Sequence, residues 1–322
     1  MQQIYWLLKF SLTTVISFIF LVSCGGAGLI NSDNLTNDSP DSNSSCPEVS
    51  GPEVMGSVSS DLIDEASGLV ASRTNSGVLW THNDSGDQPR IFAMNLKGDH
   101  LGEFNLLNTE NHDWEDIAAG PGPADGEQYL YIGDIGDNSR IRTSIFVYRL
   151  REPEVEQTQP PVSMDITDVD VLEMQYPDNQ AFDAETLLVD PVSGDIFIVT
   201  KNNTATSKVF RNPSPHNADE IFTLEEVATV KLGTSFLYAV TGGDVSGDGS
   251  MIILRSYLNA VILFRDDAED MAHSFTGVSC GVPVDESLGQ QGEAITFDPD
   301  GSGYTTVIEG LHPSLTHYSI NN

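Results

Sequence analysis

The sequence has few basic residues, and it lacks long apolar runs outside its N-terminus. Only 14 Lys and Arg stand against 48 Asp and Glu, so the 322-residue chain has a formal net charge of −34 at pH 7. Such a surface repels nucleic acid and anionic lipid head groups, which excludes a nucleic-acid partner unless cations are concentrated at one site. The His-Glu-x-x-His signature of zinc proteases is absent. Helical periodicity is also scarce, which argues against an all-α protein.

The one extended apolar run begins at residue 10 and ends at residue 22. It is short for a membrane span and ends in small residues, as a secretory signal does. The tetrapeptide 21–24 (LVSC) resembles the lipobox of bacterial lipoproteins, whose cysteine receives a diacylglycerol. This resemblance implies a signal peptide at 1–23 and a lipid anchor on Cys24 in the cell envelope. An uncleaved anchor is the alternative. Gly25 follows the cysteine, which implies the outer membrane if the source has two membranes.

Only two further cysteines exist, Cys46 and Cys280. Export allows disulfides, so a bridge between them would hold the start of the folded domain to a late segment. Whether they are paired stays open at this point.

The composition changes sharply after the lipid site. Residues 24–51 are rich in Gly, Ser, Asn, Asp and Pro, which predicts a flexible tether. Residues 52–322 carry short apolar runs separated by turn signals, which predicts one all-β domain. The runs that read as strands include 78–82, 91–94, 129–132, 144–148, 196–200, 251–254, 260–264 and 305–308.

A short acid-headed segment recurs along this domain. The copies start near Glu65, Glu115, Glu185, Asp244 and Glu293. Their separation approaches the ~40–50 residues of a propeller blade. The last copy supplies only three strands, and residues 54–59 offer the missing outer one. We therefore expect a β-propeller of five four-stranded blades closed by the N-terminal strand. Six blades are possible if residues 266–288 hide a degenerate one.

Each recurring acid should open the innermost strand of its blade, beside the central channel. The second strand returns to the same face, because neighbouring strands are antiparallel. The repeat therefore predicts acids in five equivalent positions around one mouth, with a second circle of Asp84, Asp134, Lys201, Arg255 and Glu309 beside them.

So many carboxylates require protonation, ion pairs with Lys201 and Arg255, or a bound cation. Carboxylate oxygens suit Ca²⁺, which takes about 6–8 oxygen ligands. The candidate ligands are Glu65, Asp84, Glu115, Asp134, Asp137, Glu185, Asp244, Glu293 and Glu309, and the segments 113–116 and 133–138 are the densest candidates. In the structural alternative, these acids cap backbone amides of the neighbouring blade or pair with the two cations. The acidic loops 244–249 and 298–301 lack the ligand spacing of a helix-flanked calcium loop and are interpreted as hairpin turns.

Catalytic candidates are fewer. His82 and His112 fall near the expected mouth and could act as acid or base, although each could equally be a hydrogen-bonded structural residue. Lys201 and Arg255 could hold an anionic group above a bound cation, an arrangement suited to metal-assisted phosphoester hydrolysis.

Several segments carry a resemblance to a known group: 65–69 (EASGL), 80–86 (WTHNDSG), 113–118 (DWEDIA), 133–138 (GDIGDN) and 292–295 (GEAI). Together they are similar to exported bacterial β-propeller proteins of unassigned activity, which are loosely akin to calcium-dependent phytases and lactonase-type propellers. The resemblance implies the propeller fold over most of 54–322 but no particular reaction. Two functions remain. One is a binding or scaffold lipoprotein for an envelope, glycan, peptide or small-molecule partner. The other is a metal-dependent hydrolase of a phosphoester or lactone.

Overall fold

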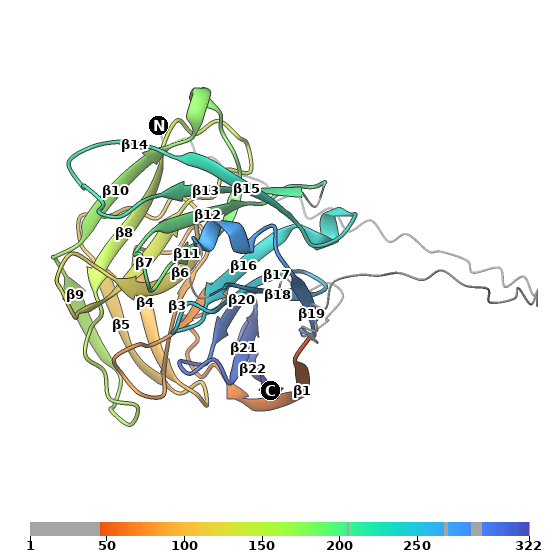
Figure 1. Ribbon diagram of the computed structural model, residues 1–322. Helices are drawn as coiled ribbons and strands as arrows, with labels where there is room; N and C mark the ends of the chain where they lie inside the picture. Colours follow the sequence, from red (N-terminus) through yellow and green to blue (C-terminus); the bar gives the residue numbers. More distant parts are fainter. Residues whose placement is uncertain (1–45, 205, 267–269, 285–291, 322) are drawn as a thin grey trace, which may run out of the picture. The chain divides into compact units, whose positions relative to one another are not determined.

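The computed structural model describes residues 46–204, 206–266, 270–284 and 292–321. Their strands form five sheets arranged as the blades of a propeller (Figure 1). The predicted signal peptide, Cys24 and the tether up to residue 45 lie outside the described residues. Among the described helices, none has the length and apolar character of a membrane span.

Each blade has four antiparallel strands, which are named below in order from the central axis outward. Blade 1 contains β2 (Ala66–Ala71), β3 (Val78–Asn83), β4 (Arg90–Asn95) and β5 (His100–Leu106). Blade 2 contains β6 (Trp114–Pro121), β7 (Gln128–Asp134), β8 (Ile145–Arg151) and β10 (Asp170–Gln175). Blade 3 contains β11 (Ala184–Val189), β12 (Ile196–Thr200), β13 (Thr206–Asn212) and β15 (Glu225–Lys231). Blade 4 contains β16 (Val240–Val245), β17 (Met251–Ser256), β18 (Ala260–Phe264) and β19 (Ser279–Val282). Blade 5 contains β20 (Gly292–Phe297), β21 (Gly303–Ile308), β22 (Ser314–Asn321) and β1 (Glu48–Ser57).

Two blades carry a short fifth strand on their outer edge. The parallel strand β9 (Val162–Ile166) lies along β5, and β14 (Phe222–Thr223) lies along β10. Each comes from a segment later in the chain, so it covers an edge that would otherwise expose unpaired backbone. The short helices are η1 (Pro177–Asn179), η2 (Phe236–Tyr238) and α1 (Met271–Ser274). The described part of residues 266–288 supplies α1 and β19 of blade 4, so it forms no sixth blade.

The N-terminal strand closes the ring, as the sequence predicted. β1 pairs with β22 from Glu48 opposite Asn321 to Ser57 opposite Ser314. The strand begins before the predicted end of the tether at residue 51, because its side chains are mostly exposed and need no apolar pattern. A disulfide joins Cys46 to Cys280 on β19, with 5.5 Å between the Cα atoms. The beginning of the described domain is therefore fixed to two blades, by hydrogen bonds to blade 5 and by a covalent bond to blade 4.

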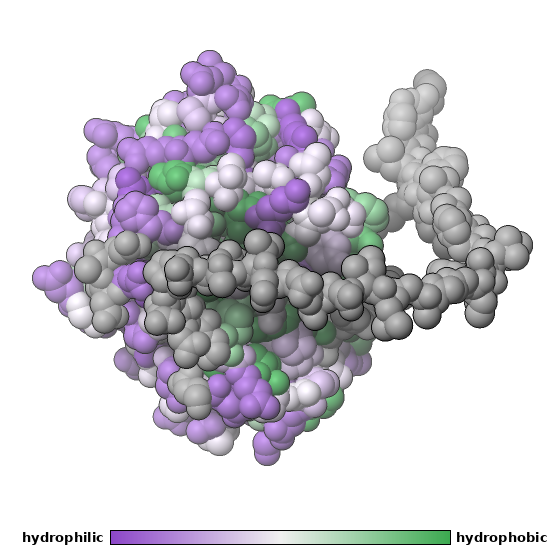
Figure 2. All heavy atoms as spheres, turned by 45° about the vertical axis from the view of Figure 1, so that its right-hand side comes forward, coloured by the Kyte–Doolittle hydropathy of each residue, from purple (hydrophilic) through white to green (hydrophobic). Residues whose placement is uncertain are grey.

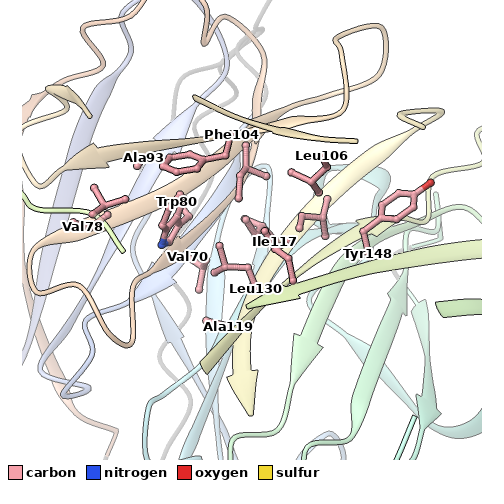
Figure 3. Close-up of a cluster of buried hydrophobic side chains, with 14 of the residues drawn as sticks. Val70, Val78, Trp80, Ala93, Phe104, Leu106, Ile117, Ala119, Leu130 and Tyr148 are labelled. Carbon is pink, nitrogen blue, oxygen red and sulfur yellow. The ribbon is translucent and has the colours of Figure 1, made fainter. Parts of the chain in front are cut away.

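The core is divided into five apolar clusters, one at each junction between neighbouring blades. Figure 3 shows the junction of blades 1 and 2, where Val70, Trp80 and Phe104 pack toward Ile117 and Leu130. The innermost strand of every blade is buried on both faces, so it shows no alternation of buried and exposed residues. Hydrophilic side chains cover much of the outer surface (Figure 2), in keeping with the net charge of −34.

Trp80 joins this core to the segment that follows β8, and a substitution tests how much this contact stabilises the fold. Its Nε1 donates to Glu152 Oε1 at 2.8 Å, and both side chains are buried. Trp80→Phe removes that donor and leaves a smaller ring, so we expect a loss of about 1–3 kcal/mol in the free energy of unfolding. Tyr148→Phe at the same junction loses only a long 3.4 Å contact with Glu110 N and should cost less. Urea titration measures both variants, and equal losses would contradict this role for Trp80.

Candidate metal centre

Three glutamates occupy equivalent positions where the innermost strands begin. Glu115, Glu185 and Glu293 each follow the first paired residue of their strand, at an irregularity in the pairing with the second strand. All three are buried, with 3–4% of their surface exposed. Ser67 and Thr241 hold this position in blades 1 and 4, where they donate to Glu115 O and Gly292 O of the next blade. This position of the innermost strand therefore carries an acid in three blades and a hydroxyl group in two.

The prediction of five equivalent acids is wrong for Glu65 and Asp244. Glu65 precedes the first residue of β2 and is exposed. Asp244 pairs opposite Ile253, well past the irregularity in β16. An acid next to small residues fits several registers of a strand, and only the observed pairing selects one. Residues 241–243 (TGG) occupy the equivalent place in blade 4 and carry no acid. The next acidic residue, Asp244, was therefore assigned to the repeat.

Asp116 and Asp244 instead join neighbouring blades. Asp116 Oδ2 accepts from Leu187 N at 3.0 Å, and Asp244 Oδ2 accepts from Phe297 N at 2.9 Å. Burial raises the pKa of both carboxyls, while these amide donors act in the opposite direction. The structural alternative for the acids, capping of backbone amides in the next blade, thus holds for these two residues.

Two overlapping groups of carboxylates have the geometry of a cation site. Asp84, Asp113 and Glu115 form one, and Glu115, Asp183 and Glu185 form the other. Within each group, one oxygen per residue lies within 4.8 Å of the others. Glu115 belongs to both groups. A single ion beside Glu115 could therefore be bound by carboxylates of both groups.

Asp183 was absent from the predicted ligands, and Asp113 was predicted only as part of the dense acidic segment 113–116. Each lies two residues before a mouth glutamate, in the pattern Asp-x-Glu at 113–115 and 183–185. Their backbones are also equivalent, because Gly136 N donates to Asp113 O and Lys201 N donates to Asp183 O across the first two strands. The repeated Asp-x-Glu pattern was the signal in the sequence that could have identified them.

The carboxylates of the mouth share a strong electrostatic penalty. Burial and the neighbouring acids Asp84 and Asp183 raise the pKa of Asp113 to about 6. Burial raises the pKa of Glu185 to about 7, even though Lys201 opposes the shift. The pKa values of Glu115 and Glu293 lie well above the ordinary value, because both are buried and both feel the charge of Glu185. A cation would relieve the repulsion that these shifts express.

Lys201 is the cation nearest to this group. Its Nζ lies 2.5 Å from Glu185 Oε1 and 5.4 Å from the centre of the Tyr257 ring. Glu309 shares a hydrogen bond with Glu293. One part of the mouth therefore presents grouped carboxylates, and another presents an ammonium group beside a phenol.

Asp134 and Asp137 were both predicted as ligands, but Asp134 is paired with the guanidinium of Arg142 and Asp137 accepts from a backbone amide. Arg142 Nη1 donates to Asp134 Oδ1 at 2.7 Å, and Arg142 N donates to Asp137 Oδ2 at 2.7 Å. His112 also contacts Asp134, with 3.2 Å between Nδ1 and Oδ2, and 55% of its side chain is exposed. These residues form a charge network at the rim. Of the predicted acid–base candidates, only His112 has solvent access there.

His82 and Arg255 are fully buried, so the expectation that they face the open mouth is wrong. His82 contacts Asn83 O through Nδ1 at 2.9 Å and stands edge-on to Trp114. Arg255 Nη1 donates to Ala294 O at 2.9 Å. Gly292 leaves room for that guanidinium, since a Cβ there would lie 1.9 Å from Nη2. Both side chains therefore fill space between blades.

Residues 277–281 also carry a Gly-x-Ser-x-Gly pattern, which was not among the predicted sites. In hydrolases this pattern places its serine on a sharp turn between a strand and a helix. Here Ser279 lies in β19, the outer strand of blade 4, where it pairs with Leu263 of β18. The next residue is the disulfide-bonded Cys280. The pattern therefore does not form a nucleophile site.

The fold and this mouth define a five-bladed β-propeller with an acidic axial opening. No protein-family model matches the sequence, and no curated protein does. One similar solved structure is the PQQ-bound form of an aldose sugar dehydrogenase from Streptomyces coelicolor. It shares 10% identity, covers 85% of this chain and 98% of its own, and gives a TM-score of 0.47. Similarity at this level says nothing about the ligand of this chain.

Gly136 provides a direct test of the carboxylate group. A Cβ at this position would lie 2.1 Å from Glu115 Oε1 and 2.5 Å from Asp113 Oδ2. Gly136→Ala should therefore displace both oxygens and weaken Ca²⁺ binding by about tenfold or more, which corresponds to about 1.4 kcal/mol. Gly281→Ala is the matched control, because nothing lies within 4 Å of its added methyl group. Calorimetric titration with Ca²⁺ compares the two, and equal affinities would contradict the assignment.

Proposed function

We propose that the protein is a lipid-anchored envelope lipoprotein whose propeller binds Ca²⁺ at its acidic mouth and presents that ion to a partner. The observation that carries the proposal is the pair of carboxylate groups that share Glu115. They gather five acids from the first three blades at one opening, namely Asp84, Asp113, Glu115, Asp183 and Glu185.

The donor set fits calcium better than softer metals. Every candidate ligand atom is a carboxylate oxygen, and Ca²⁺ takes about 6–8 oxygen ligands in flexible geometry. Neither group contains a histidine or cysteine, the ligands that favour zinc or copper. Gly136 supports the fit, because the absence of a side chain leaves Asp113 and Glu115 close together. The ion would neutralise charges that otherwise repel one another.

Calcium bound here would also create a place for an oxygen ligand from a partner. Asp84 and Asp113 are partly exposed, whereas Glu115, Asp183 and Glu185 are buried. The buried acids would bind the ion on the side that faces the protein, and the side that faces solvent would stay open. A glycan hydroxyl or a carboxylate of a peptide could complete the coordination, with Lys201 beside it as a donor. This supports a binding or scaffold role as the first choice.

The anchor belongs to the same proposal. A signal peptide at 1–23, a lipid on Cys24 and a tether that follows it would hold the propeller at the membrane, with the outer membrane as the site in a cell that has two. Metabolic labelling with radioactive palmitate and cell fractionation test this part. Cys24→Ala should abolish labelling and release the protein from the membrane fraction. A labelled or membrane-bound variant would contradict the lipid anchor.

A metal-dependent hydrolase is the second candidate. The observation in its favour is Lys201, which places an ammonium group next to the carboxylates that would hold the ion. An ion held by these acids would supply an activated water, and Lys201 would stabilise the negative charge that develops on a phosphoester or lactone.

One experiment separates the two functions. The purified mature protein is loaded with Ca²⁺, its metal content is measured by mass spectrometry, and it is assayed on a panel of phosphoesters and lactones. About one ion per chain without turnover supports the binding function. Turnover that is lost in Lys201→Gln supports the hydrolase. A protein that retains no calcium contradicts both.

A further inference from the structure

A cavity lies away from the acidic mouth, on the other side of the innermost strands. It has a volume of about 620 Å³ and lies between blade 1 and blade 5, where β2 and β20 end. We call it the interblade groove. Leu79 and Phe297 line its depth, and the partly exposed Met55 and Leu96 line its rim. Its size falls in the range of about 300–1,000 Å³ that is typical of small-molecule sites.

Arg73 stands at the inner end of this groove. It follows β2 of blade 1 and reaches blade 4, where Nη2 donates to Val245 O at 2.7 Å. Its side chain is only 10% exposed and lies 3.8 Å from the Asp244 carboxylate, which is too long for a hydrogen bond. Nη1 is buried and has no hydrogen-bond partner among the described residues. A buried donor without an acceptor destabilises the folded state, so an acceptor that reached it would bind favourably.

A second cavity meets the groove at the same residue. It has a volume of about 300 Å³ and is lined by Gly120, Pro191 and Gly247, which follow or end the innermost strands of three blades. Arg73 and Pro299 line both cavities. Gly247 leaves room for the guanidinium itself, since a Cβ there would lie 2.7 Å from Nη1. The guanidinium therefore stands at the junction of the two cavities.

The other charges of the groove already have partners. Asp298 Oδ2 lies 2.9 Å from His317 Nε2, and Asp300 accepts from Ser302 Oγ at 2.6 Å. Asp244 is held by the amide of Phe297. Arg73 is thus the group in the groove with hydrogen-bonding capacity left over. The fork of a guanidinium matches the two oxygens of a carboxylate.

We infer that the interblade groove binds a small amphipathic carboxylate, with its carboxylate on Arg73 and its apolar body between Leu79, Phe297 and Leu96. This site is separate from the acidic mouth and requires no metal. It would give the propeller two ligand sites of opposite preference, one for cations and one for an organic anion.

Calorimetric titration of the full mature protein tests the site. The probes are 4-phenylbutanoate and its neutral amide, both measured in the presence of a calcium chelator. We expect the carboxylate to bind about tenfold more tightly than the amide, as a charge-assisted hydrogen bond of about 1.5–3 kcal/mol requires. Arg73→Gln should remove this preference, whereas Asp219→Asn in an exposed loop of blade 3 should leave it unchanged.

A second variant keeps the test decisive if Arg73→Gln does not fold. Leu96 is 42% exposed at the rim, so Leu96→Asp should leave the fold intact and weaken binding of the carboxylate probe. The inference is overturned if neither probe binds, if Arg73→Gln retains the preference, or if Leu96→Asp binds as well as wild type. Because chelator is present throughout, failure here leaves the calcium proposal untouched.

Discussion

The metal-free protein should lose stability as the pH rises from about 5 to about 8, and Ca²⁺ should restore it. The pKa values of Asp113 and Glu185 are raised to about 6 and about 7 in the folded state. Unfolded carboxyls titrate near about 4. Between these values the folded chain holds more protons than the unfolded chain, so the free energy of unfolding falls with rising pH. The stabilising protonation is complete below about pH 4 and lost above about pH 7.

Calcium should reverse this trend, because ionised carboxylates are its ligands. Bound Ca²⁺ at one hundred times its dissociation constant adds about 2.7 kcal/mol to the free energy of unfolding. The gain in melting temperature should therefore be small at about pH 5 and large at about pH 8. Thermal melts in chelator and in Ca²⁺ across this range measure both effects. A calcium shift that is the same at both ends would contradict the assignment.

Glu115→Gln sharpens this test, because it makes the shared ligand neutral. In chelator at about pH 8, this variant should be more stable than wild type, since one buried charge is removed. In Ca²⁺ the order should be reversed. Asp248→Asn changes an acid in a hairpin turn, where Ser246 and Ser250 already donate to it, and should behave as wild type. A Glu115→Gln protein that is weaker than wild type in chelator would show that the glutamate has a structural role.

Breaking the disulfide should have the second large effect. Cys46 and Cys280 are separated by 234 residues, and closing so long a loop strongly restricts the unfolded chain. Cys46→Ser should therefore cost about 2–5 kcal/mol in the free energy of unfolding. Chemical denaturation measures this loss.

Reductant provides the control for that variant. Treating the wild-type protein with a reductant should lower its stability by a similar amount, while the Cys46→Ser protein should not respond. A wild-type midpoint that is unchanged by reductant would contradict a stabilising role for the bond. The calcium shift should persist in Cys46→Ser, because the acidic mouth lies on other strands.

The architecture could be predicted because a propeller repeats its pattern. Five acid-headed segments, the strands after them and a missing outer strand in the last copy sufficed for five blades closed by β1. The beginning of β1 was misplaced, since Glu48 and its neighbours are exposed and form a strand only through pairing with β22. The parallel additions β9 and β14 were not foreseen either, because they depend on which distant edge lies nearby.

The site was predicted less completely, and register is the physical reason. Glu115, Glu185 and Glu293 were placed correctly because each heads a strand of similar length. Asp244 was assigned to the same ring, but pairing moves it along its strand and gives it to a backbone amide. Nothing in the sequence around Arg255 indicates that its side chain is buried between blades. Whether the acids hold a metal stays a prediction.

Calorimetric titration of the full mature protein with Ca²⁺ at about pH 7.5 tests the central claim, that the paired carboxylate groups form one cation site. We expect about one ion per chain in wild type and in Asp248→Asn. In the double variant Asp113→Asn, Asp183→Asn, which changes two acids that belong to different groups, binding should weaken by about a hundredfold, or about 2.7 kcal/mol. Unchanged affinity in the double variant, or no binding to wild type, would contradict the account.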